Sequence, residues 1–163
     1  MKALRLTLVG FLFLLPSKAL PVEKTLFRPT VFPVVHESVT SDFGMRKHPI
    51  SSTRHFHTGV DLAARKGSDI RAIADGVVEV RGEFSGYGRT AVLRHSSSIE
   101  TYYAHCDALL VEIGQYIVAG QKIGTVGESG VATGPHLHFE VRVNGWAVNP
   151  EKLIPYLVGN AEG

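Results

Sequence analysis

The chain has 163 residues, 44% of them hydrophobic, and its 17 basic and 15 acidic residues give a formal net charge of +2. This length suits one domain with a single core. No segment has the concentrated basic face expected for nucleic-acid binding, so nucleic acid is excluded as a partner. Cys106 is the single cysteine, which excludes an internal disulfide. We expect it to be a small buried residue rather than a metal ligand.

The N-terminal segment predicts a signal peptide. Lys2 and Arg5 precede an apolar stretch at residues 6–15, which suits the core of an export signal but is too short to span a bilayer. Pro16 ends the stretch, and the small residues that follow predict cleavage after Ala19. An uncleaved N-terminal anchor is the alternative. The segment carries three basic residues and no acidic one, so its removal leaves 14 basic against 15 acidic residues.

From residue 39 onward the sequence predicts β structure. Short runs rich in Val, Ile, Tyr and Thr are separated by glycines, as in an all-β sandwich or barrel, and no amphipathic helix of ordinary length is predicted. We expect an all-β, compact, mainly antiparallel domain with short loops and little helix. The expected division is a signal peptide at residues 1–19, an extended lead-in at 20–38, the β domain at 39–155 and a short tail at 156–163.

Six segments are expected to contain the clearest strands. In chain order they are residues 72–82, 88–95, 99–105, 116–126, 136–143 and 146–148. The fourth segment divides into two short pieces around a central Ala-Gly pair. Asn144-Gly145 predicts a tight hairpin between the last two strands. The glycine-rich residues 127–134 lack the spacing and the lysine of a phosphate-binding loop, so they are expected to turn the chain or let backbone approach a ligand.

Four histidines and one aspartate form the strongest functional signal. His57 and Asp61 are four residues apart in HTGVD, a segment that favours a turn bringing both side chains together. His105 ends the run TYYAH. His136 and His138 alternate along one expected strand and therefore share a face. Neutral imidazole and carboxylate are the usual ligands of a catalytic zinc that keeps one position open for water.

Spacing alone leaves the roles within this set open. Either His136 or His138 could bind a metal while the other reaches the substrate. His105 titrates near neutral pH, so it could take a proton from an activated water or donate one to an oxyanion. The helical H-E-x-x-H motif of many zinc proteases is absent, so no glutamate is placed in advance as the base.

Other polar residues near these motifs allow two interpretations each. Glu140 shares the expected face of the histidine pair, where it either orients a ligand histidine or is an exposed strand carboxylate. Arg46 either faces the site and contacts a substrate carboxylate or, as the favoured interpretation, lies on the surface. Tyr102 and Tyr103 alternate, so one should enter the core while the other lines the site. His95 is expected to be a strand-end residue.

In these segments the chain resembles the lysostaphin/LytM-type zinc peptidoglycan endopeptidases. The resemblance spans roughly residues 40–150, and its motifs are SDFGMRKHP (41–49), FHTGVDLAARKGSDIRAIADGVV (56–78), GYGRTAVLRH (86–95), YYAH (102–105), VEIGQYIVAGQKIGTVG (111–127) and ATGPHLHFEVRVNG (132–145). It implies that His57, Asp61 and His138 bind zinc (Zn2+) and that His105 and His136 are the catalytic histidines. It also implies a compact antiparallel domain with a groove across its sheet.

The expected function is therefore that of a secreted zinc metalloendopeptidase which hydrolyses peptide bonds in peptidoglycan stems or cross-bridges. We expect a monomer that is exported to the periplasm rather than the medium, with no stable membrane insertion after signal removal. The alternative is a non-catalytic protein of the same fold that binds the wall or activates an amidase. In the family such proteins have usually lost metal ligands, whereas all five positions are filled here. A β-sandwich module with incidental histidines would bind no stoichiometric metal.

Overall fold

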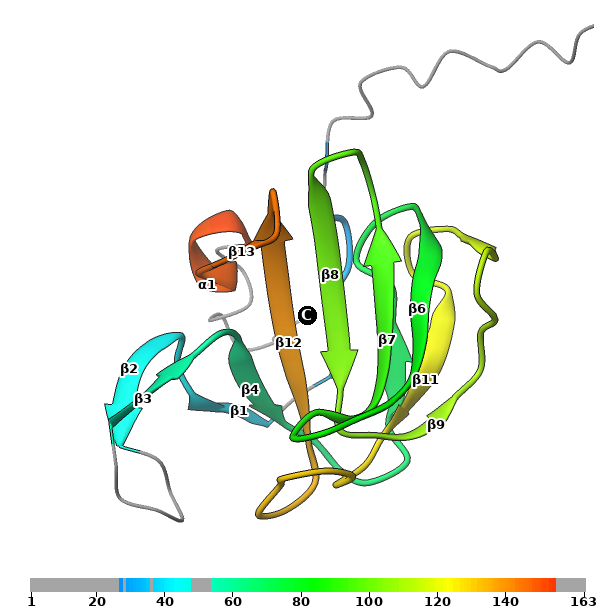
Figure 1. The fold of residues 1–163 in the computed structure, drawn as a ribbon. Coiled ribbons are helices and arrows are strands. Elements are labelled where there is room, and N and C mark those ends of the chain that lie inside the picture. Colours follow the sequence, from blue (N-terminus) through cyan, green and yellow to red (C-terminus); the bar gives the residue numbers. More distant parts are fainter. Residues whose placement is uncertain (1–26, 28, 36, 48–53, 155–163) are drawn as a thin grey trace, which may run out of the picture.

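The computed structural model describes residue 27 and residues 29–35, 37–47 and 54–154, which contain thirteen strands and one helical turn (Figure 1). The predicted signal peptide, its cleavage site and the C-terminal tail lie outside the described residues. Within the described ranges, no helix has the length and hydropathy that a membrane crossing requires.

An eight-stranded antiparallel sheet forms the body of the domain (Figure 1). Its order is β1 (Ser38–Ser41), β4 (Val60–Ala63), β12 (His136–Val143), β8 (Ile99–Ala104), β7 (Gly88–Arg94), β6 (Gly76–Phe84) and β10 (Tyr116–Ile117), with β13 (Trp146–Val148) paired to β12. Every strand pair in it is antiparallel. The all-β, mainly antiparallel fold predicted from the sequence is thus confirmed.

Two smaller sheets and a short helix complete the described fold. β5 (Asp69–Arg71), β11 (Lys122–Val126) and β9 (Cys106–Leu109) form a three-stranded sheet, and β2 (Gly44–Lys47) forms a two-stranded sheet with β3 (Arg54–His57). The helix α1 (Pro150–Leu153) begins at Asn149, whose side chain accepts a hydrogen bond from the Glu151 amide at 2.9 Å. This cap and the proline at the first helical position are ordinary helix-start features.

Most of the predicted strands are confirmed, with one shifted boundary. The segment 116–126 divides into β10 and β11 as expected, and the hairpin after β12 turns at Asn144 and Gly145, with φ of 51° and 79°. The strand expected within residues 72–82 starts only at Gly76 and runs on to Phe84. Strands of three or four residues such as β4, β5 and β9 are too short for their periodicity to be recognised.

The core lies between the large sheet and the three-stranded sheet. Leu137, Phe139 and Val141 of β12 point into it, and Ile70 and Ile123 of the smaller sheet belong to the same buried cluster. Tyr103 is also in this core, so it is the inward member of the Tyr102–Tyr103 pair. The opposite face of β12 is left for His136, His138 and Glu140, because successive strand residues alternate in direction.

Described residues of the expected lead-in pack onto this core. Val34 is buried, and Phe27 and Phe32 pack against the cluster. Backbone hydrogen bonds also hold this segment against the domain. The Thr30 amide donates to the Ile73 carbonyl at 3.0 Å, and the Arg71 amide donates to the Pro33 carbonyl at 2.8 Å. Burying a side chain such as Val34 contributes about 1.5 kcal/mol. This part of the chain therefore stabilises the domain.

Candidate active site

Strand pairing brings the predicted site residues of β4 and β12 together. In the antiparallel register His138 lies opposite Asp61 and His136 lies opposite Ala63, so the aspartate and both histidines share the face that points away from the core. β8 flanks β12 on its other side, with Ala104 opposite His138. His105 follows directly after Ala104 and therefore emerges beside the same end of the sheet.

A bend at Gly59 places His57 beside Asp61, so the two side chains come together as the sequence predicted. His57 ends β3 and Asp61 lies in β4, with Thr58 and Gly59 between the two strands. A Cβ atom on Gly59 would lie 2.3 Å from the Phe139 carbonyl oxygen and 3.0 Å from Cε1 of His138. Only glycine allows this bend to pack so closely against β12.

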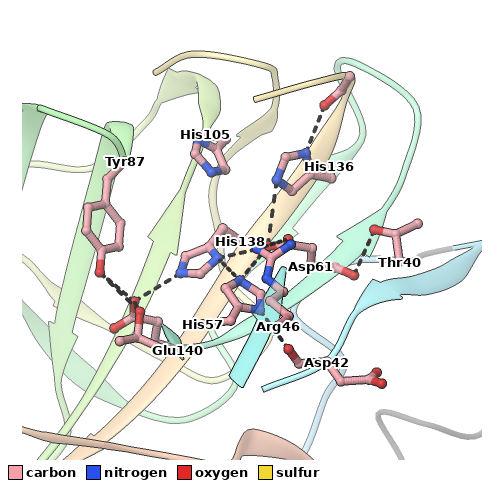
Figure 2. Close-up of polar contacts among 12 residues, drawn as sticks. Thr40, Asp42, Arg46, His57, Asp61, Tyr87, His105, His136, His138 and Glu140 are labelled. Atoms are coloured by element: carbon pink, nitrogen blue, oxygen red, sulfur yellow. Dashed lines mark hydrogen bonds and ion pairs between the residues drawn. The ribbon is translucent and has the colours of Figure 1, made fainter. Parts of the chain in front are cut away.

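His57, Asp61 and His138 direct three atoms at one point (Figure 2). His57 Nε2 lies 3.0 Å from His138 Nδ1 and 3.1 Å from Asp61 Oδ1, and His138 Nδ1 lies 2.8 Å from that same oxygen. All three residues are buried. The three side chains come from β3, β4 and β12, so the point lies where the hairpin meets the large sheet.

His57 and His138 each make a hydrogen bond on the side of the ring that points away from the convergence point. These bonds determine which ring nitrogen carries the proton and which has a free lone pair. His57 Nδ1 donates to the Asp42 carbonyl at 2.8 Å, and His138 Nε2 donates to Glu140 Oε1 at 3.0 Å. With those protons assigned, His57 Nε2 and His138 Nδ1 are both acceptors that face a carboxylate oxygen. Three lone pairs without a proton between them are suited to a cation, and two neutral imidazoles with one carboxylate are ligands that zinc prefers.

The electrostatics of the centre also favour positive charge. Burial opposes a charged imidazole, but hydrogen bonds with Asp61 and Glu140 raise the pKa of His138 above its usual value. Burial likewise opposes ionisation of Asp61, yet hydrogen bonds from His138 and His57 lower the pKa of this carboxyl well below its usual range. The donor set thus fits the predicted zinc ligands, whose role stays a prediction.

Glu140 supports His138 from within the protein. Its carboxylate is fully buried, which excludes the interpretation as an exposed strand carboxylate. Besides His138, it accepts hydrogen bonds from the Tyr87 hydroxyl at 2.7 Å, from the Thr58 hydroxyl and from Arg142 Nε at 2.8 Å. Burial opposes ionisation, but the bonds from His138, Thr58 and Tyr87 lower the pKa of Glu140 to about 2.

Tyr87 and Thr58 are site residues that sequence reasoning missed. Thr58 lies inside the HTGVD motif and Tyr87 inside GYGRT, so membership of these motifs was the only signal that could have singled them out. Their hydroxyls become important only because a buried carboxylate of β12 lies between them. Such ligand-orienting groups around a metal site are common.

His105 and His136 lie side by side next to the three convergent residues. Their ring centroids are 4.7 Å apart, and His105 lies 5.7 Å from the ring of His138. His105 Nδ1 donates to the Ser129 carbonyl at 2.7 Å, and His136 Nδ1 donates to the Gly134 carbonyl at 2.8 Å. Both bonds go to the glycine-rich loop of residues 127–134, whose backbone therefore orients the two rings and leaves each Nε2 as an acceptor.

His105 has an unusual backbone and a shifted pKa. Its φ is 58°, in the left-handed region that non-glycine residues seldom adopt. Burial lowers the pKa of His105 to about 4, against the opposing hydrogen bond to the Ser129 carbonyl and with help from the nearby His136 and His138. The imidazole is therefore neutral at pH 7 and able to accept a proton.

A groove of about 500 Å³ contains all five predicted site residues. Its lining also includes His55 and Phe56 of β3, together with Tyr87 and Thr133. Arg46 also lines the groove, where its Nη2 lies 3.4 Å from Asp61 Oδ2, so the favoured interpretation as a surface arginine is wrong (Figure 2). The β2–β3 hairpin, which the sequence did not predict, folds this arginine over the site.

The remaining candidates lie outside the groove lining. Cys106 is buried beneath the sheet, where its thiol donates to the Tyr103 carbonyl at 3.4 Å and burial raises its pKa to about 12. Its expected role as a small buried residue is confirmed. Tyr102 shares the outer face with Glu140, but it stacks on the Arg142 guanidinium at 4.1 Å and does not line the groove. None of the described residues between 27 and 38 lines it either.

Comparisons with known sequences identify a peptidase family. Residues 55–150 match the sequence model of Peptidase family M23. The chain is 47% identical over 118 residues to the DD-carboxypeptidase/endopeptidase Mpg of Neisseria meningitidis, covering 72% of this chain and 27% of that protein. It is also 42% identical over 98 residues to the murein hydrolase activator NlpD of Salmonella dublin, covering 60% and 26%. The chain thus spans little more than a quarter of the length of these relatives.

Solved structures agree with the sequence comparison. A zinc-containing peptidase from Vibrio cholerae is 39% identical with a TM-score of 0.68, over 72% of this chain and 37% of that one. The catalytic domain of lysostaphin from Staphylococcus simulans is 30% identical with a TM-score of 0.64, over 71% and 90%. The family match covers more than half of the chain and encloses all five predicted site residues, as the resemblance to lysostaphin-type enzymes predicted. This chain belongs to Peptidase family M23.

Proposed function

We propose that this protein is an exported, monomeric zinc metalloendopeptidase of the periplasm that hydrolyses peptide bonds in peptidoglycan stems or cross-bridges. One observation carries the proposal: three lone pairs converge in a groove directly beside two histidines whose Nε2 atoms are acceptors. The similarity to a DD-carboxypeptidase/endopeptidase and to a zinc-containing peptidase supports this chemistry.

His57, Asp61 and His138 would hold the zinc ion. When bound there, zinc would supply Lewis-acid chemistry that lowers the pKa of a water and polarises a peptide carbonyl. The chain keeps the ligands oriented, because the Asp42 carbonyl holds the tautomer of His57 and Glu140 holds that of His138. All three residues are largely buried yet line the groove, so an ion held there would still be within reach of a substrate.

His105 and His136 would manage protons and developing charge. In the hydrolysis, the oxygen of water bonds to the carbonyl carbon, the C–N bond breaks, and the leaving nitrogen gains a proton. His105 is neutral at working pH, so its Nε2 can accept the proton of the attacking water and return it to that nitrogen. His136 faces the same groove, and once its Nε2 carries a proton it would donate a hydrogen bond to the carbonyl oxygen as negative charge develops there.

Digestion of purified sacculi tests this function. We expect the zinc-loaded protein to release fragments that mass spectrometry identifies as cut at peptide bonds, with loss of activity after chelation and recovery on adding zinc. Elemental analysis should find about one zinc per chain. Expression of the whole chain followed by cell fractionation and mass measurement of the mature N-terminus tests export. Sacculi that stay intact with a zinc-loaded protein would overturn the proposal.

The match to a protein named murein hydrolase activator supports a second candidate, a wall-bound activator of a separate amidase. The two functions give different results in one assay. An activator would leave sacculi intact when alone and would increase their digestion by an added amidase. Because His57, Asp61, His105, His136 and His138 are all present and converge, we favour the enzyme.

A further inference from the structure

We propose that Arg46 determines specificity by binding a free carboxylate of the substrate on the leaving-group side of the scissile bond. The inference rests on the proposed function and names its substrate class. That class comprises peptides in which the carbon attached to the scissile nitrogen bears a free carboxylate.

The position of Arg46 places its charge next to the reacting centre. It lies in β2, opposite His55 of β3, on the hairpin that forms one side of the groove. Its Nη2 contacts Asp61 Oδ2, whereas the other oxygen of Asp61 faces His57 and His138. The guanidinium is therefore in direct contact with one of the three predicted metal ligands. About 30% of its side chain remains exposed, so a substrate in the groove can reach it.

Arg46 is also the single residue with a permanent positive charge among the described groove-lining residues. The others are hydroxyl, aromatic, histidine or small side chains, apart from the acidic Asp61. A guanidinium offers five N–H donors in a planar fork. Among the described residues, its hydrogen bond to Asp61 uses Nη2, and Nε is buried without a hydrogen-bond partner. Because Nε is buried, a carboxylate in the groove would accept from N–H groups of the terminal nitrogens, which the single bond to Asp61 only partly uses.

Peptidoglycan peptides differ in whether they offer such a group. Where D-alanine is joined to another D-alanine, or to the side-chain amine of diaminopimelate, the carbon beside the scissile nitrogen carries a free carboxylate. In a glycine bridge the corresponding carboxyl group is part of the next amide and has no charge. The carboxylate carbon is separated from the scissile carbonyl carbon by two backbone atoms, roughly 4 Å or less, so it lies close to the bond that breaks.

A purely supporting role for Arg46 predicts something different. If the arginine only held Asp61 in place, its loss would slow every substrate by the same factor and would weaken zinc binding. If it recognises the substrate, its loss must change the ratio between substrates and leave the zinc content intact. The comparison of two substrates therefore separates the two roles.

The experiment uses two synthetic D-Ala–D-Ala peptides that are identical except for the terminal group, a free carboxylate in one and a carboxamide in the other. We expect the zinc-loaded protein to cleave the carboxylate peptide with a kcat/KM at least about tenfold higher, the factor typical of one charge-assisted hydrogen bond. Arg46→Gln should remove this preference with zinc unchanged, and Arg46→Lys should retain part of it. Arg65→Gln removes the same charge at a 90% exposed side chain and should match wild type.

A binding measurement keeps the inference independent of turnover. Calorimetry with the zinc-loaded His105→Ala variant should show the same tenfold preference, lost when Arg46→Gln is added. Equal binding of both peptides, or an Arg46→Gln variant that slows both equally, would overturn the inference. If sacculi and peptides stay uncleaved while the Arg46-dependent binding preference persists, the recognition stands and the proposed hydrolase function fails.

Discussion

Removing the charge of Glu140 should weaken zinc binding at the proposed site without changing any of the three predicted ligands. The carboxylate is fully buried and accepts from His138, Tyr87, Thr58 and Arg142. Glu140→Gln keeps the shape but loses the charge, so the ring of His138 is less firmly held. Loss of such a ligand-orienting partner typically costs 10- to 100-fold in metal affinity, which corresponds to about 1.4 to 2.7 kcal/mol.

The metal-free fold should weaken as well, by an amount that depends on the substitution. Glu140→Ala leaves the Arg142 guanidinium and the His138 N–H without their acceptor, and breaking a buried charged pair costs about 3 to 5 kcal/mol. Arg142 is partly exposed, which favours the lower end of that range. Glu140→Gln still accepts one hydrogen bond, so about 1 to 3 kcal/mol is expected.

Two measurements check these values. Competition with a chromophoric chelator gives the zinc dissociation constant, and urea unfolding of the metal-free protein gives the free energy of unfolding. The matched control is Glu79→Gln in β6, because the Glu79–Arg94 pair is solvent-exposed and should contribute less than about 1 kcal/mol. If Glu140→Gln binds zinc as tightly as wild type and unfolds at the same urea concentration, the buried carboxylate does not support His138.

Four further substitutions test the rest of the site and fold. Asp61→Ala removes the oxygen that faces both ligand imidazoles, so elemental analysis should find the zinc lost, and a fully loaded variant would contradict the ligand assignment. His105→Ala should keep its zinc and hydrolyse sacculi at least about 100-fold more slowly; retained activity would remove it from proton transfer. Gly59→Ala sets a methyl group 2.3 Å from the Phe139 carbonyl oxygen, so urea unfolding should show a loss of about 2 to 3 kcal/mol, and a negligible loss would mean that the turn can shift. Burial lowers the pKa of His95 below its ordinary 6.5, so the unfolded chain binds the proton more readily and stability should decrease as pH falls below that value. His95→Gln should flatten this pH dependence, and an unchanged slope would refute it.

The sequence predicted which candidate side chains lie together better than it predicted the scaffold around them. Alternation along a strand was enough to place His136 and His138 on one face. The glycine between His57 and Asp61 favoured the turn that brings them together. These inferences needed only local geometry. The assignment of individual roles came from the family resemblance, because spacing could not decide which of the two strand histidines faces the metal.

Features that depend on long-range pairing could not be predicted in the same way. The register that sets Asp61 opposite His138 joins strands that are 77 residues apart. Arg46 was interpreted as a surface residue because exposed arginines are common, and only the folding of the β2–β3 hairpin over β4 brings it to Asp61. The burial of Glu140 likewise follows from Tyr87 and Thr58, which reach it from separate segments.

The β2–β3 hairpin has a mechanical consequence for the groove that it borders. Its strands pair with each other and, within the described residues, with no strand of the large sheet (Figure 1). At the site its anchors are side chains, His57 at the three-atom centre and Arg46 on Asp61. An ion that joined His57 to Asp61 and His138 would link the β2–β3 hairpin to the large sheet. If the proposed zinc binds there, its bonds to His57 would tie the hairpin to β4 and β12 in addition to the ion pair of Arg46 with Asp61.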